Sequence, residues 1–154
     1  MEIVNFKETA FDKTSIQNFF IEVNNDFKPT LTERIEQKSD VKTIETYCDK
    51  LLEKAELVIC IVDNKIAGLM AFYSNNIITR EAFVSLLCVK QEYRKLGIGK
   101  EIMIHCISKI KLSGMKCIKL ETNSDNYIAI KLYENLGFKN VNTINNTVYL
   151  THEL

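Results

Sequence analysis

The feature that most constrains this chain is a glycine-bearing turn between a strand-like run and a helix-like run. Residues 82–89 are almost continuously apolar, residues 94–99 read Arg-Lys-Leu-Gly-Ile-Gly, and residues 100–111 are typical of a helix. A strand, a short turn and a helix start bring several unpaired backbone N–H groups to one point, where they can bind an anion. Arg94 and Lys95 add positive charge there. The turn therefore predicts a phosphate or pyrophosphate site.

Two known phosphate-binding motifs do not account for this turn. The dinucleotide fingerprint requires a third glycine at position 102, which is Ile102, and the nucleotide P-loop requires a Gly-Lys-Ser/Thr sequence that this stretch lacks. A purely structural role also stays open, because Gly97 and Gly99 can simply permit a tight entry into the helix.

The composition limits the classes of partner. The 154 residues carry 20 basic and 20 acidic side chains, so the formal net charge is zero. Nucleic-acid binding draws on an excess of positive charge, so nucleic acid is not expected as the main partner. No apolar run reaches the roughly 18 residues of a membrane span, and the N-terminus does not have the pattern of a signal peptide. We therefore expect one domain over residues 1–154, in the cytoplasm and not in a membrane.

The cysteines indicate a reducing compartment. They number five, an odd count, and no C-x-x-C pair occurs. Because disulfide frameworks and structural metal sites use paired or clustered cysteines, we expect buried free thiols and no metal.

The periodicity of apolar residues predicts a mixed sheet in the order β-α-α-β-β-β-α-β-α-β-β. Strands are predicted over residues 3–6, 57–62, 65–73, 81–90, 115–122, 138–144 and 147–150, and helices over 11–23, from near Ser39 or Asp40 to 55, over 98–112 and from Ser124 or Asp125 to Gly137. Residues 24–37 are predicted to be a loop, and residues 63–64 and 145–146 to be hairpin turns. The fold class is α/β (α+β), with about seven strands and a right-handed parallel crossover in the middle.

Two spaced motifs resemble those of one enzyme superfamily. Residues 94–99 fit R-x-x-G-x-G, and residues 126–138 fit N-x-x-A-x-x-L-Y-x-x-x-G-F. Their order and separation resemble the GNAT superfamily of N-acetyltransferases. The resemblance covers residues 57–140 well, whereas residues 8–56 match only in their coarse helix–helix layout. It implies a GNAT-like twisted sheet with helices on both faces.

The resemblance also implies a place for acetyl-CoA. The cofactor would lie in a wedge between the splayed parallel strands 81–89 and 115–122, with its pyrophosphate on the backbone N–H groups of the glycine turn and its pantetheine arm along the first strand. The cofactor-binding residues would be Leu87, Cys88, Val89, Arg94, Lys95, Leu96, Gly97, Ile98, Gly99, Lys100, Asn126 and Tyr133. Asn126 can equally be an ordinary polar residue at the start of a helix.

For the chemistry, the resemblance assigns the backbone N–H of Leu87 to the developing oxyanion and the Tyr133 phenol to protonation of the departing thiolate. An aromatic that only packs the core is the alternative for Tyr133. Glu81 and Glu121 are weak candidates for a general base, beside a chain of water molecules. An acyl intermediate on Cys88 is disfavoured, because no basic residue beside it in sequence would lower its pKa.

The acceptor is expected to meet the first two helices and the loop 24–37, where Phe27, Leu31 and Arg34 lie. We expect a primary amine, on a small molecule rather than a protein, acetylated by direct attack in a ternary complex of a monomer or homodimer. Two alternatives remain: a non-catalytic module that binds acyl-CoA as a sensor or partner domain, and a dinucleotide binder.

Overall fold

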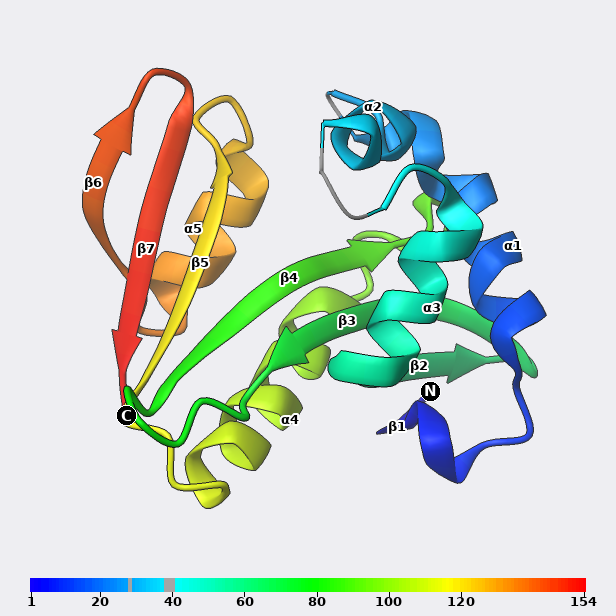
Figure 1. The fold of residues 1–154 in the computed structure, drawn as a ribbon, viewed down its shortest axis with the longest axis horizontal. Helices are drawn as coiled ribbons and strands as arrows, with labels where there is room; N and C mark the ends of the chain where they lie inside the picture. The colour runs from blue at the N-terminus through cyan, green and yellow to red at the C-terminus, as the bar shows by residue number, and fades with distance from the viewer. Residues whose placement is uncertain (28, 38–40) are drawn as a thin grey trace.

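The computed structural model describes residues 1–27, 29–37 and 41–154. Its centre is a seven-stranded sheet in the order β1-β2-β3-β4-β5-β7-β6 (Figure 1). The strands are β1 (Glu2–Asn5), β2 (Glu56–Val62), β3 (Lys65–Tyr73), β4 (Glu81–Val89), β5 (Cys117–Asn123), β6 (Lys139–Ile144) and β7 (Thr147–Glu153). Neighbouring strands are antiparallel except β4 and β5, which are parallel. The predicted mixed sheet and fold class are confirmed.

Helices cover both faces of this sheet. They are α1 (Lys13–Val23), α2 (Leu31–Glu36), α3 (Ile44–Lys54), α4 (Ile98–Leu112) and α5 (Tyr127–Asn135), with 3-10 turns η1 (Phe6–Glu8), η2 (Asn24–Asp26) and η3 (Gln91–Tyr93). The α1–α3 core, which includes Phe19 and Leu51, lies on one face. The α4–α5 core, which includes Ile102 and Tyr133, lies on the other. None of the helices within the described ranges is both long and apolar enough to cross a membrane.

Helix α2 corrects the prediction that residues 24–37 form a loop. Its first turn is closed by a capping box: the Thr30 hydroxyl accepts a hydrogen bond from the Glu33 N–H (3.2 Å), and the Glu33 carboxylate accepts one from the Thr30 N–H (3.0 Å). Leu31 and Ile35 are buried in the α1–α3 core. Six residues carry too little periodicity to reveal a helix, and the T-x-x-E capping signal was the only local sign of it.

The start of the next helix also differs from the prediction. The predicted start near Ser39 or Asp40 lies outside the described residues. Helix α3 begins at Ile44, after Thr43, whose hydroxyl accepts a hydrogen bond from the Thr46 N–H (3.1 Å).

Both predicted hairpin turns are confirmed. Asp63 and Asn64, between β2 and β3, have φ angles of 51° and 62°, and Asn145, between β6 and β7, has a φ of 55°. Asp and Asn tolerate this left-handed region better than most residues, so they suit two-residue hairpins.

The parallel strands β4 and β5 separate along their length. They pair only over residues 81–83 and 117–119. Figure 1 shows the resulting V, with β1–β4 and the N-terminal helices in one limb and β5–β7 with α5 in the other. Strand β4 keeps its pairing with β3 as far as Val89, whereas among the described residues its other edge has no strand partner beyond residue 83. This is the wedge that the sequence resemblance implied.

A β-bulge at Ser85 switches the faces of β4. The register between β3 and β4 moves by one residue there. Before it, Ala82 and Val84 pack in the α4–α5 core. After it, Leu86 and Cys88 pack in the α1–α3 core. The bulge adds local twist, which is consistent with the separation of the two strands just beyond it.

All five cysteines are buried and free, as the sequence predicted. Burial raises the pKa of the Cys48, Cys88 and Cys106 thiols to about 12. These thiols are therefore protonated and weakly nucleophilic at neutral pH.

Candidate functional site

The glycine turn presents a row of open backbone N–H groups. Helix α4 begins at Ile98, and its first intrahelical bond runs from the Glu101 N–H to the Gly97 carbonyl (3.0 Å). Ahead of it, the Arg94 N–H donates to the Gln91 carbonyl (3.2 Å). Between these two bonds, the N–H groups of residues 95–100 have no acceptor in the part of the chain that the structure describes. Six such donors at a helix N-terminus favour an anion.

The two glycines of this turn have different structural requirements. Gly97 has a φ of 79°, and a Cβ built there would meet no atom within 4 Å. Turn geometry alone therefore favours glycine at this position. Gly99 has no positive φ, and a Cβ there would lie 3.7 Å from Leu132 and 3.9 Å from Val89, which are ordinary contacts. The purely structural alternative thus accounts for Gly97 but not for Gly99.

Arg94 braces the turn from the side of the N-terminal helices. Its Nε donates a hydrogen bond to the Val89 carbonyl (3.0 Å), and its Nη2 lies 3.0 Å from Oδ2 of Asp26. These bonds join the end of β4, the turn and η2. A direct contact between Arg94 and a phosphate stays a prediction, as it does for Lys95, Leu96 and Lys100, whose side chains are exposed.

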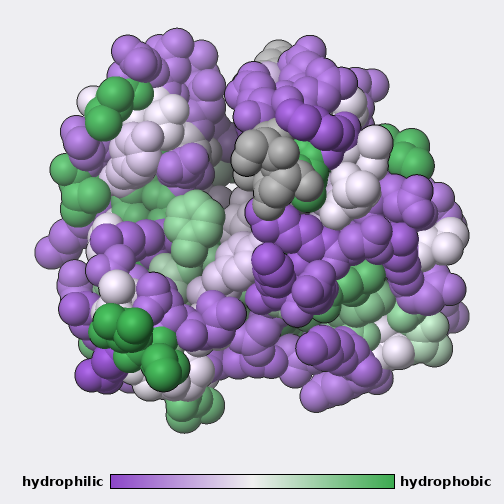
Figure 2. Space-filling view, viewed as in Figure 1, coloured by the Kyte–Doolittle hydropathy of each residue, from purple (hydrophilic) through white to green (hydrophobic). Residues whose placement is uncertain are grey.

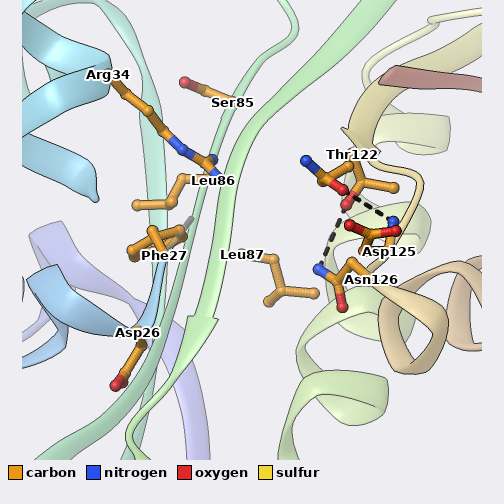
Figure 3. Close-up of a pocket in the computed structure, with 10 residues that line it drawn as sticks. Asp26, Phe27, Arg34, Ser85, Leu86, Leu87, Thr122, Asp125 and Asn126 are labelled. Atoms are coloured by element: carbon orange, nitrogen blue, oxygen red, sulfur yellow. Dashed lines mark hydrogen bonds between the residues drawn. The ribbon is translucent and has the colours of Figure 1, made fainter. Parts of the chain in front are cut away.

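A cavity of about 330 Å³ opens where β4 and β5 diverge (Figures 2 and 3). It will be called the wedge cavity. The residues that line it are Asp26, Phe27, Arg34, Ser85, Leu86, Leu87, Thr122, Asn123, Asp125 and Asn126. They come from η2 and α2 on one side, from β4 in the middle, and from β5 and the start of α5 on the other. Leu87 and Asn126 are the two sequence-predicted site residues among them.

Asn126 also caps helix α5. Its Oδ1 accepts a hydrogen bond from the Ala129 N–H (3.4 Å), and its Nδ2 donates to Oγ1 of Thr122 (3.4 Å). Both bonds are long, and the side chain lies at the wall of the cavity (Figure 3). The ordinary capping role is therefore present, and cofactor binding by Asn126 stays a prediction.

The open edge of β4 contains the three predicted pantetheine partners. Leu87 and Val89 are half-buried against the α4–α5 core. The Cys88 side chain points to the opposite side, into the α1–α3 core. Its burial and high pKa argue further against an acyl-cysteine intermediate, as the sequence indicated.

Tyr133 lies on α5 in the same core as Leu87 and Val89, but it does not line the wedge cavity. Its ring centroid is 5.8 Å from that of Phe138. Within the described ranges its hydroxyl has no hydrogen-bond partner. Burial raises the pKa of Tyr133 to about 12, so the phenol is protonated at neutral pH. The side chain fits the predicted acid chemically, while its packing also fits the alternative of a core aromatic.

The two candidate glutamates do not line the wedge cavity. Oε2 of Glu81 lies 2.7 Å from Nζ of Lys119, at the closed end of the V. The hydrogen bond from Lys119 lowers the pKa of Glu81, which makes it a weaker base. Glu121 is exposed and follows Leu120, which is buried in the α4–α5 core. By strand alternation, Glu121 faces the side of the sheet that carries α1–α3.

Sequence reasoning named Arg34 only as part of the segment expected to meet the acceptor, and it gave no role to Asp125. The guanidinium of Arg34 lies 5.0 Å from the centroid of Phe27, and its Nε donates to the Pro29 carbonyl (3.0 Å). Burial lowers the pKa of Arg34, but an arginine remains charged at neutral pH. Asp125 lies on the opposite wall, where its N–H donates to Oδ1 of Asn123 (2.8 Å). No local motif marks these residues, because the fold brings them together from distant segments.

Comparison with known proteins places this geometry in a family. A family model described as "Acetyltransferase (GNAT) family" matches residues 20–138. The [ribosomal protein bS18]-alanine N-acetyltransferase of Escherichia coli K12 is 33% identical over 81 residues, which are 53% of this chain and 54% of that protein. The chain thus spans about half the length of these curated relatives.

Solved structures share the complete fold. A protein from Pyrococcus horikoshii OT3 has a TM-score of 0.77 at 22% identity, covering 99% of both chains. The PaiA N-acetyltransferase of Thermoplasma acidophilum, solved in complex with coenzyme A, has a TM-score of 0.72 at 18% identity, covering 100% of both. These structures share the fold with the chain, and the family model assigns it to a family. The chain belongs to the GNAT family.

Proposed function

We propose that this protein is an N-acetyltransferase that moves an acetyl group from acetyl-CoA to a primary amine within a ternary complex. The observation that carries the proposal is the row of open N–H groups at residues 95–100 beside the unpaired edge of β4. The open N–H groups can bind a pyrophosphate, and the unpaired strand edge can form hydrogen bonds with an amide-rich pantetheine arm. The two features are adjacent because η3 and the turn follow β4 directly.

In this proposal each part of the site has one task. The 95–100 turn holds the pyrophosphate, and the edge of β4 at Leu87, Cys88 and Val89 aligns the acyl carrier. The amine nitrogen attacks the thioester carbonyl, so a C–N bond forms and the C–S bond breaks. The Leu87 N–H donates to the carbonyl oxygen as negative charge develops, a contribution of about 3 kcal/mol for a preorganised donor.

Two proton transfers complete the reaction. The Tyr133 phenol gives its proton to the departing thiolate, and its raised pKa keeps that proton available across the physiological range. The amine loses its proton to water or to Glu121, which faces the acceptor side of the sheet. Glu81 has no part in this scheme, because Lys119 holds it at the closed end of the V.

The decisive experiment measures thiol release from acetyl-CoA with a panel of amines. Wild type is compared with Tyr133→Phe and with Tyr127→Phe, a control on the same helix whose side chain is exposed. Turnover by wild type and the control, with a rate lower by about 100-fold or more in Tyr133→Phe, supports the proposal. Acetyl-CoA binding without turnover on any amine favours the sensor or partner module instead.

Three broader expectations belong to the same proposal. Residues 1–154 act as one domain, which is supported by two cores that share a single sheet. The protein works in the cytoplasm, which is supported by its buried free thiols. We expect the acceptor to be a small molecule rather than a protein, and the enzyme to act as a monomer or homodimer without a nucleic-acid or membrane partner.

A further inference from the structure

The wedge cavity has charges of opposite sign on its two walls. Figure 3 shows the Arg34 side chain extending from α2 toward the space between β4 and β5, with Asp125 on the far side of that space. The other carboxylate of the lining, Asp26, is 3.0 Å from the Arg94 guanidinium. The cavity therefore places a guanidinium and a carboxylate on either side of the position where an acceptor would enter.

The guanidinium of Arg34 is held in position before any ligand arrives. The Phe27 ring lies 5.0 Å away, and the Pro29 carbonyl accepts the Nε–H at 3.0 Å. The capping box of Thr30 and Glu33 fixes the helix that carries it. A guanidinium has five N–H donors, so it can serve an acidic ligand in addition to neighbouring groups of the protein. Its planar shape matches a carboxylate in a two-point contact.

We propose that the acceptor carries a carboxylate close to its amine and that Arg34 binds this carboxylate, which rests on the acetyltransferase function proposed above. Asp125 attracts the ammonium form of the same molecule from the opposite wall. The cavity of about 330 Å³ is at the small end for ligand sites, and in the proposed function it also holds the acyl end of the cofactor. The part of the acceptor that enters it is therefore small. The carboxylate can belong to a free amino acid or to an acidic side chain near a peptide N-terminus.

The test compares paired acceptors with and without a carboxylate, with kcat/KM expressed per concentration of unprotonated amine. Alanine is compared with alaninamide, and the peptide amide Ala-Glu-Ala with Ala-Gln-Ala, so that the two sources of carboxylate are separated. The variants are Arg34→Gln, Arg34→Lys and the control Arg80→Gln, whose Nε bonds to Gly114 (2.8 Å) far from the cavity. A thermal melt confirms that each variant is folded.

We expect wild type and Arg80→Gln to favour the acidic member of one pair by about 10-fold or more in kcat/KM. Arg34→Gln should remove that preference by raising KM for the acidic acceptor. The kcat for the acidic acceptor should change less than its KM, and kcat/KM for the neutral acceptor should change less than kcat/KM for the acidic one. Arg34→Lys should keep part of the preference, because a lysine keeps the positive charge but lacks the planar guanidinium that makes a two-point contact with a carboxylate. A role of Arg34 in packing alone would instead change both members of a pair equally.

Two results overturn the inference while leaving the proposed function intact: equal kcat/KM for acidic and neutral acceptors in wild type, or an unchanged preference in Arg34→Gln. If no amine is acetylated at all, the proposed function fails. Calorimetry of alanine and alaninamide with the protein and coenzyme A then decides the inference, since tighter binding of alanine that depends on Arg34 supports it and equal binding refutes it.

Discussion

Replacing Gly97 by alanine should weaken acetyl-CoA binding far more than it destabilises the fold, and a second glycine provides a matched control. Gly97 and Gly114 have φ angles of 79° and 88°, and a Cβ at either position would meet nothing within 4 Å. An alanine in this left-handed region costs about 1–2 kcal/mol. Gly97→Ala and Gly114→Ala should therefore lower the melting temperature by similar amounts, about 2–4 °C per kcal/mol for a chain of this size.

Acetyl-CoA binding should separate the two variants. Gly97 lies within the row of open N–H groups at residues 95–100, whereas Gly114 lies beyond the other end of α4. A hydrogen bond to a charged group contributes about 1.5–3 kcal/mol. If Gly97→Ala loses two of the N–H hydrogen bonds to the pyrophosphate, acetyl-CoA binding weakens by at least about 100-fold. Calorimetry with acetyl-CoA measures this. Equal affinity for Gly97→Ala, Gly114→Ala and wild type would refute the role of the turn.

Three further predictions use the same site. Gly99→Ala should fold normally, because its Cβ has ordinary contacts at 3.7 and 3.9 Å, and the larger Gly99→Val should stay folded but lose acetyl-CoA binding measured by calorimetry. Because burial raises the pKa of Tyr133 to about 12, the kcat–pH profile should show no falling limb near pH 10; such a limb would contradict its role as the acid. The raised pKa of Cys88 stabilises the fold below about pH 9, and this contribution is lost as the pH rises toward 12. The free energy of unfolding measured with urea should therefore fall over that pH range, and it should fall less steeply in Cys88→Ala. An equal pH dependence in wild type and variant would contradict the raised pKa of Cys88.

The sequence predicted the features that local residue chemistry controls. Asp63 and Asn64 take the left-handed angles that a two-residue hairpin needs, and Gly97 takes the one that the turn before α4 needs. The buried strands and long helices follow from runs and periodicities that span many residues. The strand–helix–strand order predicted the parallel pair β4 and β5, and the two motifs implied their separation through the resemblance that they carry.

The features that the sequence did not predict depend on contacts between distant segments. The bulge at Ser85 leaves no local sign, since burial alternates along β4 on both sides of it although the face changes. Helix α2 is too short for a periodic pattern, and its capping box at Thr30 is a weak signal by itself. Arg34 and Asp125 come to one cavity only because α2 and the β5–α5 loop converge on β4. Their charges therefore had no interpretation before the fold was known.

We propose that acetyl-CoA binds to the backbone of residues 95–100 and to the open edge of β4, and amide-resolved NMR of the labelled protein, titrated with acetyl-CoA, can locate the bound cofactor. We expect the largest shifts and the greatest gain in protection from hydrogen exchange on the N–H groups of residues 95–100 and on those of Leu87 and Val89. Binding that leaves these amides unchanged and perturbs another surface would contradict the claim.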